Sequence, residues 1–291
     1  MKKVLILCVC LALGFVAATG TVAYFTDTVE ANQNVIEAGT VDVSQHEFER
    51  VRDEQGKFEC ETDANGALTD QLKLAPFTDT DKAMYPTMAP AVDDPASGTE
   101  SQWKTYNILG TAVTMPDETF PGIVDKIVTV TNEGSLHAYV RTYIAIPTQW
   151  FENGTELVKI PWLELVYNKQ GWTWDFVAKR QTIEHKGVSA VYDIYALTYE
   201  KPLLPQQQTS PGLLGIYMCG NVNGDANGYY VVSPDGVRYD IGTTSQLKVL
   251  VTSVATQGNT EIMTDGASAA IDLVFKSAEE GAKYHPWQKK N

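Results

Sequence analysis

Short segments that alternate apolar and polar residues restrict the fold of this chain more than any other feature. Val, Ile, Thr and Tyr recur in them with a period of two, and clusters of Asn, Asp, Gly and Pro separate the segments. Alternation suits a half-buried strand, whereas a helix repeats about every 3.6 residues, and the separating residues favour turns. Only residues 277–283 suggest a short helix. We therefore predict an all-β chain whose antiparallel strands pack as a sandwich.

One pair of predicted strands is the clearest. Residues 126–131 are followed by turn residues at 132–135 and then by residues 136–146, which place a mainly apolar set on one face. We predict a hairpin with that face in the core. Further strands are predicted at 163–168, 172–178, 189–199, 229–233, 237–241, 247–255 and 270–275.

The segment 45–115 interrupts this pattern. Asp, Gly, Pro and Thr accumulate there and the strand alternation weakens. We interpret the segment as an elaborated, surface-exposed insertion on a single sandwich domain that spans residues 24–291. A small separate subdomain is the alternative, against which the scarcity of apolar residues argues.

The acidic composition limits the partners. The chain carries 36 acidic and 22 basic side chains, which gives a formal charge of −14. Binding to nucleic acid or to anionic lipid requires clustered Lys and Arg. We therefore exclude nucleic acid as a partner and do not expect a membrane surface to be one.

The first 23 residues are typical of an export signal. Two lysines precede an apolar run over residues 4–18, and residues 21–23 form a small-x-small cleavage sequence. The run is shorter than the roughly 20 residues that a membrane-spanning helix needs. We predict cleavage between Ala23 and Tyr24, contact with the membrane during export only, and a secreted mature protein.

The residues that follow this site resemble a known family. Residues 24–28 (YFTDT) and 34–43 (NVIEAGTVDV) are similar in type and spacing to the start of mature proteins of the TasA/camelysin family, which Gram-positive bacteria export. Further similar segments follow in the same order, at 120–122, 128–144, 199–215 and 249–258. The segment 45–115 departs from the family pattern.

This resemblance implies a fold and a role. It implies that a SipW-type signal peptidase removes the leader and that the mature chain forms a jelly-roll or immunoglobulin-like sandwich. It also implies a structural subunit of extracellular fibres or biofilm matrix, located in the matrix or on the cell surface. The partners would then be further copies of the chain or other matrix subunits.

Cleavage would start the mature chain with a short apolar arm that contains Tyr24, Phe25, Val35 and Ile36. The unpaired N–H and C=O groups of a sheet edge accept any compatible strand. Our hypothesis is that processing frees the arm for head-to-tail strand addition to a neighbouring copy, a contact that does not close and so propagates as a filament. The alternative is that residues 24–43 form the first strand of a monomer.

The catalytic motifs that we sought are incomplete or missing. His46 and Glu47 begin an H-E-x-x-H zinc motif, but Arg50 stands where the second histidine is required. The G-x-S-x-G motif and the Gly-rich phosphate-binding loops do not occur. Relatives carry a metallopeptidase label that these residues do not support, so we predict a protein that is not an enzyme and has no cofactor.

One polar segment partly resembles a calcium loop. Asn221, Asn223 and Asp225 place oxygen-bearing side chains on alternate residues. Ala226 replaces the glycine of such a loop, and Val232 stands where its bidentate glutamate belongs. We favour a polar turn over a low-affinity calcium site.

Two cysteines remain after removal of the signal. In an oxidising exterior, Cys60 and Cys219 could close one long loop. The sequence leaves open whether they meet, because a disulfide needs their Cα atoms within about 7 Å.

Two aromatic groups pose a choice between core and surface. Trp172 and Trp174 share one face of a predicted strand. Either they cap the core, which we favour, or they form an exposed platform for sugar rings or a protein partner. The row Tyr139, Arg141 and Tyr143 is expected to pack through cation–π contacts. A platform would support the alternative function, an extracellular adhesin or a module that binds a polysaccharide or a protein.

Overall fold

The computed structural model describes residues 26–28, 41–78, 82, 84, 86–88, 102–120, 122–185, 187–242, 248–257, 267, 271–272 and 283–288. Within these residues almost all regular structure is β-strand, which confirms the all-β prediction. No helix in these ranges is long and apolar enough to cross a membrane. The cleavage site and the four apolar residues of the predicted arm lie outside the described residues.

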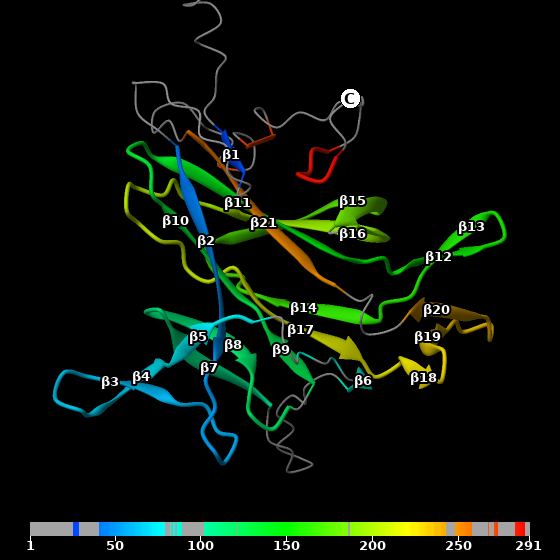
Figure 1. Cartoon of the computed structure of the whole chain (residues 1–291), viewed down its shortest axis with the longest axis horizontal. Helices are drawn as coiled ribbons and strands as arrows, with labels where there is room; N and C mark the ends of the chain where they lie inside the picture. The colour runs from blue at the N-terminus through cyan, green and yellow to red at the C-terminus, as the bar shows by residue number, and fades with distance from the viewer. Residues whose placement is uncertain are drawn as a thin grey trace, which may run out of the picture.

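The larger layer of the sandwich is a five-stranded antiparallel sheet (Figure 1). Its strands in spatial order are β1 (Thr26–Thr28), β21 (Leu250–Gln257), β11 (Ala138–Pro147), β16 (Val188–Tyr199) and β15 (Trp172–His185). β15 and β16 form the longest hairpin, and β21 pairs with β11 along its whole length.

The second layer joins two smaller sheets. One is β10 (Ile127–Asn132), β2 (Val43–Arg50) and β5 (Leu74–Pro76); the other contains β14 (Leu163–Tyr167), β17 (Leu213–Cys219), β6 (Pro86–Thr87) and β9 (Ile123–Asp125). Backbone hydrogen bonds from Thr209 to Val130 and from Gly212 to Val128, both 2.9 Å, connect the two sheets. The layer therefore runs continuously from β5 to β14.

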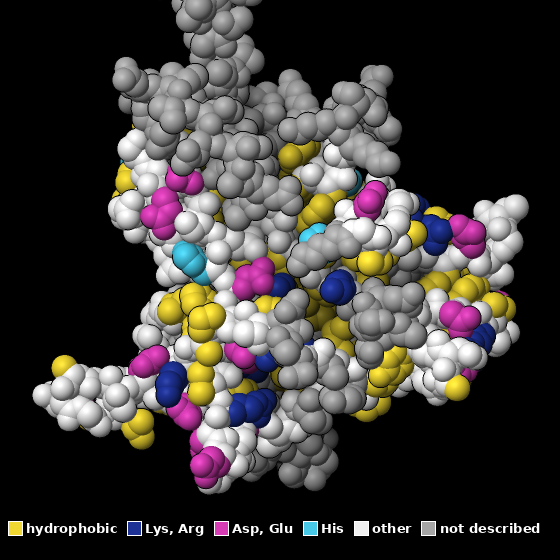
Figure 2. Space-filling view, viewed as in Figure 1, with side chains coloured by type: hydrophobic (Ala, Val, Ile, Leu, Met, Phe, Trp, Pro, Cys, Tyr) yellow, Lys and Arg dark blue, Asp and Glu magenta, His cyan; other side chains and the backbone are white. Residues whose placement is uncertain are grey.

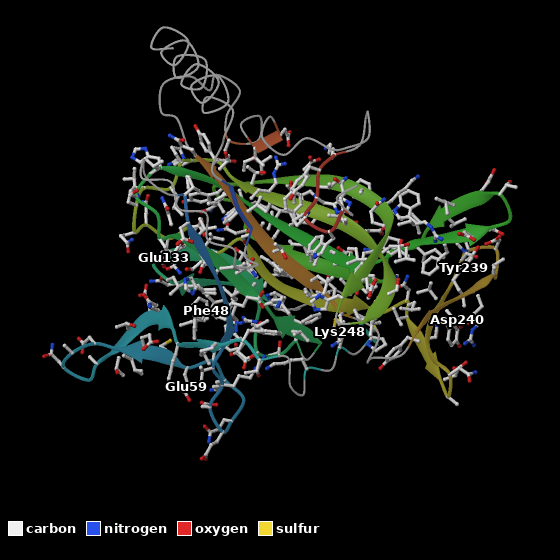
Figure 3. All side chains as sticks on the ribbon, turned by 45° about the horizontal axis from the view of Figure 1, so that its top comes forward. Phe48, Glu59, Glu133, Tyr239, Asp240 and Lys248 are labelled. Carbon is white, nitrogen blue, oxygen red and sulfur yellow. The ribbon has the colours of Figure 1, made fainter. Side chains whose placement is uncertain are left out.

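Apolar side chains from both layers meet between them (Figure 3). Val128 of β10 and Ile216 of β17 face Ile144 of β11 and Leu197 of β16 in one buried cluster. Trp162 is fully buried in it, and its indole N–H donates to the carbonyl of Thr148 at 3.1 Å. This core is what makes the fold a sandwich.

The hairpin predicted from residues 126–131 and 136–146 is wrong. β10 pairs with β2, whereas β11 pairs with β21 and β16, so the turn between them carries the chain from one layer to the other. The side chain of Asn132 holds this arch by donating to the carbonyls of Leu136 and Leu203. β14 and β15 are likewise separated by a short turn and lie in different layers. The strand predicted at 270–275 is wrong where it can be compared, since Ile271 and Asp272 are helical.

Much of the segment 45–115 forms sheets and buries apolar side chains. Its first residues belong to β2, which pairs with β10 in the second layer. A separate sheet follows, which we call the added sheet. Its strands are β3 (Cys60–Thr62), β4 (Leu68–Leu72), β7 (Trp103–Ile108) and β8 (Thr111–Pro116). Ile108 and Met115 are fully buried in a cluster that also includes Leu214 and Tyr217 of β17, so these parts of the segment are not surface-exposed.

Small hairpins project from the ends of the molecule (Figure 1). β12 (Trp150–Asn153) and β13 (Glu156–Lys159) form one of them, and β18 (Asn223–Asp225), β19 (Gly228–Val232) and β20 (Arg238–Gly242) form a sheet beside it. The ring of Tyr239, labelled in Figure 3, lies 5.1 Å from that of Phe151 and joins the two. The pairing of β19 with β20 confirms the strands predicted around residues 234–236.

Gly215 lies where β17 pairs with β14 on one side and β9 on the other. A Cβ there would approach a side-chain carbon of Ile123 at 2.9 Å and the carbonyl oxygen of Val124 at 3.1 Å. We expect Gly215→Ala to lower the free energy of unfolding by about 1–3 kcal/mol through overpacking, measured by urea denaturation. Gly224→Ala is the control: its Cβ would only touch the Tyr229 ring at 3.5 Å. Equal effects of the two changes would contradict the close packing at Gly215.

Candidate functional site

The edge of the larger sheet at β21 is the candidate functional site. β1 pairs with it antiparallel, with Thr26 opposite Thr256, Asp27 opposite Ala255 and Thr28 opposite Val254. The part of the arm that the structure describes therefore lies on the edge of its own subunit. For these three residues, that is the arrangement expected of the first strand of a monomer.

β1 covers only part of this edge. Further along β21, a side chain of β2 in the second layer contacts the strand: Gln45 accepts a hydrogen bond from the Ser253 hydroxyl at 2.7 Å. The Gln45 amide also lies 3.5 Å from the carbonyl oxygen of Val251, and Ser253 is bonded in turn to Thr142 at 2.9 Å. Within the described residues, three positions of β21 pair with β1.

The opposite edge of the same sheet, β15, is irregular. Its pairing with β16 shifts register twice, between Phe176 and Ala178 and between Ala178 and Gln181, and Arg180 adopts a φ of 51°. Bulges and basic side chains at an edge hinder the addition of another strand. The two edges of the sheet are therefore unequal: one accepts a strand and the other is distorted.

A buried aspartate holds this distortion in place. Asp193 is fully buried, and its carboxylate accepts hydrogen bonds from the Arg180 and Gln149 backbone N–H groups and from the Thr148 hydroxyl, at 2.8–3.0 Å. The Arg180 guanidinium donates to the carbonyl of Trp150 at 2.7 Å. The distorted edge is thus held by hydrogen bonds that a buried carboxylate accepts.

The predicted tryptophan pair belongs largely to the core. Trp172 is 3% exposed and its indole N–H donates to the Ser210 hydroxyl at 3.2 Å. Trp174 is half-buried and stacks on Tyr167 of β14 and on Tyr195 of β16, with ring centroids 4.6 and 4.8 Å away. These rings close the side of the sandwich between β14 and β15, so they are already engaged within the protein.

The predicted calcium residues lie on a hairpin. Asp225 accepts hydrogen bonds from the Arg238 guanidinium at 2.6 Å and from the Asn227 backbone N–H at 2.8 Å, and the bond to Arg238 lowers the pKa of Asp225. The amides of Asn221 and Asn223 donate to the carbonyls of Pro161 and Asn221. These three residues therefore lie in a polar turn and strand stabilised by hydrogen bonds within the protein. The described residues contain no group of three His, Cys, Asp or Glu side chains placed to hold a metal.

Cys60 and Cys219 are both free thiols. Cys60 begins β3 on the added sheet, and Cys219 ends β17 in the second layer. Burial, with a contribution from Glu164, raises the pKa of Cys219 to about 11. Its thiolate is therefore scarce at neutral pH.

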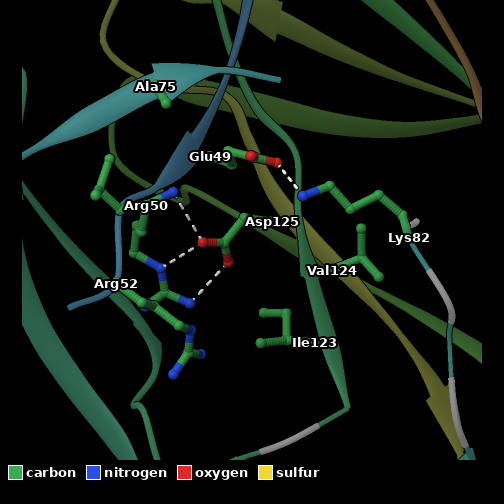
Figure 4. A pocket seen from close by; sticks show the side chains of 9 residues that line it. Glu49, Arg50, Arg52, Ala75, Lys82, Ile123, Val124 and Asp125 are labelled. Carbon is green, nitrogen blue, oxygen red and sulfur yellow. Dashed lines mark hydrogen bonds and ion pairs between the residues drawn. The ribbon is translucent and has the colours of Figure 1, made fainter. Parts of the chain in front are cut away.

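A charged cavity of 450 Å³ lies where the added sheet meets the second layer (Figure 4). Arg50 and Asp125 form its most buried pair, with two charge-assisted hydrogen bonds of 2.7 and 2.8 Å between the side chains. The Arg50 side chain is 0% exposed and that of Asp125 11%. Lys82 pairs with Glu49 on the far wall at 2.5 Å.

The Arg50 side chain also connects several elements. It donates to the carbonyl of Pro116 at the end of β8 at 2.8 Å, and its guanidinium lies 3.9 Å from the centroid of the Phe58 ring. One side chain of β2 thereby holds β9, β8 and the start of the added sheet. With these charges paired inside the protein, we assign the cavity to the joint between the sheets and not to ligand binding.

Acidic and basic side chains are interspersed over the face of the molecule in Figure 2.

Comparison of the chain with models of protein families, with curated proteins and with solved structures gave no match. The fold and the geometry of the sheet edges therefore provide the basis for a functional proposal.

Removing Asp125 should destabilise the protein strongly. Asp125→Ala leaves the Arg50 charge buried without its partner, and we expect a loss of about 3–5 kcal/mol in the free energy of unfolding, measured by urea denaturation. Glu152→Ala removes the partner of Arg180 in an exposed pair and should cost less than about 1 kcal/mol. A similar cost for both variants would show that the Arg50 pair does not hold the joint.

Cys219 should react slowly with alkylating reagents. In a Cys60→Ser variant at pH 8, we expect iodoacetamide to modify Cys219 at least tenfold more slowly than free glutathione, because the thiolate is the nucleophile. Mass spectrometry over time measures the rate. Unfolding in urea should abolish the difference, and rapid labelling of the folded protein would contradict the burial of the thiol.

Proposed function

We propose that this chain is a secreted structural subunit of extracellular fibres or biofilm matrix that assembles by strand addition at β21. The observation that carries the proposal is the inequality of the two edges of the larger sheet. Among the described residues, β21 pairs on this side with the three residues of β1, while β15 shifts register twice against β16. The resemblance of residues 24–28 and 34–43 to the TasA/camelysin family supports the same role.

Strand exchange would use the same backbone pairing that this edge already makes. A copy of β1 from a neighbouring molecule would make the same three-residue ladder that β1 makes with its own β21. The connection of residues 29–42 leads from β1 to β2, and an extended chain spans about 3.3 Å per residue, so its length is sufficient to reach an adjacent molecule. Pairing within a molecule and between molecules then compete, and concentration decides between them.

The resulting polymer would be open. The arm and the β21 edge are different surfaces, so each subunit would offer one and accept the other, and such a heterologous contact propagates without closing. We propose that a SipW-type signal peptidase frees the arm by cleaving between Ala23 and Tyr24, and that the protein acts outside the cell without catalysing a reaction.

Proline substitutions in β1 should abolish assembly. Changing both Thr26 and Asp27 to proline removes two adjacent backbone N–H groups, one of which faces β21 whichever way the strand alternates. In protein that begins at Tyr24, we expect the proline changes to reduce the amount of filament formed at a given concentration at least tenfold. Sedimentation and negative-stain electron microscopy measure this amount.

The matched control changes the same two residues to alanine, which keeps both N–H groups. This variant should assemble like the unmodified protein. Filaments of equal amount from the proline variant would remove β1 from the mechanism, and an unmodified protein that stays monomeric at every concentration would overturn the proposed function.

A further inference from the structure

The outer face of the larger sheet is apolar and covered. Tyr143 of β11, Ile194 of β16 and Val254 of β21 are fully buried on this face, in a cluster that does not belong to the core between the layers. Tyr284 and Trp287 pack against the cluster. We call residues 283–288, which contribute to this cover, the C-terminal strap.

Side chains carry much of the attachment of the strap. The Lys283 ammonium pairs with Asp175 of β15 at 2.5 Å, and the Tyr284 ring lies edge-on to Tyr143 with centroids 6.1 Å apart. Nearby, Asp272 pairs at 2.6 Å with Arg141, whose side chain is 4% exposed. The row Tyr139, Arg141 and Tyr143 is therefore on a covered face, and Arg141 lies 5.8 Å from the Tyr143 ring as the predicted cation–π contact requires.

His285 is the buried group at the centre of the strap. It is 2% exposed, and within the part of the chain that the structure describes neither ring nitrogen has a hydrogen-bond partner. Its ring centroid lies 6.5 Å from that of Trp287. The titratable and charged groups of the elements near the strap are Arg141 and Tyr143 of β11, Asp175 and His185 of β15, Tyr192 of β16, and Asp272, Lys283 and Tyr284.

Such a site favours the neutral imidazole. An apolar environment without a hydrogen-bond acceptor penalises the imidazolium, and burial lowers the pKa of His285 to about 4. In a strap that has left the sheet, the imidazole regains an ordinary pKa of about 6.5. Because the bound state has the lower pKa, its advantage is complete above pH about 6.5 and declines as the pH falls from there toward 4.

We propose that the C-terminal strap is an acid-released cover: protonation of His285 expels the strap and uncovers the apolar outer face of the larger sheet. The device is independent of strand addition at β21. It depends on the burial of His285 and on its two ring nitrogens, which have no hydrogen-bond partner among the described residues.

Hydrogen exchange of the full mature chain tests the proposal. Between pH 6.5 and 4.5, after correction for the intrinsic rate, we expect the protection of residues 283–288 to fall up to tenfold per pH unit, the limit for uptake of one proton. Binding of the dye ANS should rise in parallel as the apolar face is exposed. Protection that does not change with pH would overturn the proposal.

His285→Phe keeps an apolar ring beside Trp287 and removes the titration, so protection should become independent of pH. His46→Phe, in β2 on the second layer, is the matched control and should behave like the unmodified chain. Loss of pH dependence in both variants, or in neither, would contradict the role of His285.

Nuclear magnetic resonance of the unmodified protein gives a test that needs no variant. The proposal requires the His285 ring protons to titrate well below about pH 6.5, the ordinary value of an imidazole, and the signals of Trp287 to shift over the same pH range. A His285 resonance that titrates near 6.5 would overturn it.

Discussion

Satisfaction of backbone hydrogen bonds at the two edges of the larger sheet is the constraint on which the proposed activity depends. Each edge of an open sheet presents N–H and C=O groups that must find water, a side chain or another strand. At β15, two register shifts and Arg180 distort the edge, and the buried Asp193 holds the distortion. At β21, the same requirement is met by β1 and, at the carbonyl of Val251, by the side-chain amide of Gln45. The backbone groups of the two edges are therefore satisfied in different ways.

The attachment of the added sheet depends on a different interaction. β2 is a strand of the second layer along its length, and Arg50 at its end pairs with Asp125 while packing on Phe58. A buried charge that loses its partner is costly, so this pair restricts how β9 and the added sheet can sit against the sandwich. Burial of Ile108 and Met115 against Leu214 then completes a second core.

The all-β class and most strand positions followed from the sequence, because a period of two is a local property. Pairing did not, because the turn after Asn132 has the same local chemistry whether the next strand returns in the same sheet or crosses to the other. The core of the added sheet was missed because its apolar residues are dispersed along the chain and are completed by residues of β17. Arg50 and Asp125 are far apart in the sequence, and neither stands in a motif.

The tryptophan pair and the N-terminal arm were likewise only partly predictable from the sequence. The position of Trp172 in the core could be expected from its strand face and its size, whereas the stacking of Trp174 on Tyr167 required knowledge of which strands close the side of the sandwich. The arm was predicted from the residues that follow a predicted export signal. The difference between the two sheet edges comes from the bulges of β15, and the sequence around Arg180 carries no sign of them.

Both ends of the described chain attach to the larger sheet, but in different ways. β1 adds to its edge through backbone pairing, and the C-terminal strap lies on its outer face through side chains. An edge contact extends a sheet within its own plane, whereas an uncovered apolar face allows contact perpendicular to that plane. Under the two proposals, these attachments respond to different variables, since backbone pairing between copies would depend on concentration and attachment of the strap on pH. Growth along the edge and contact through the face would then be separable properties of one sheet.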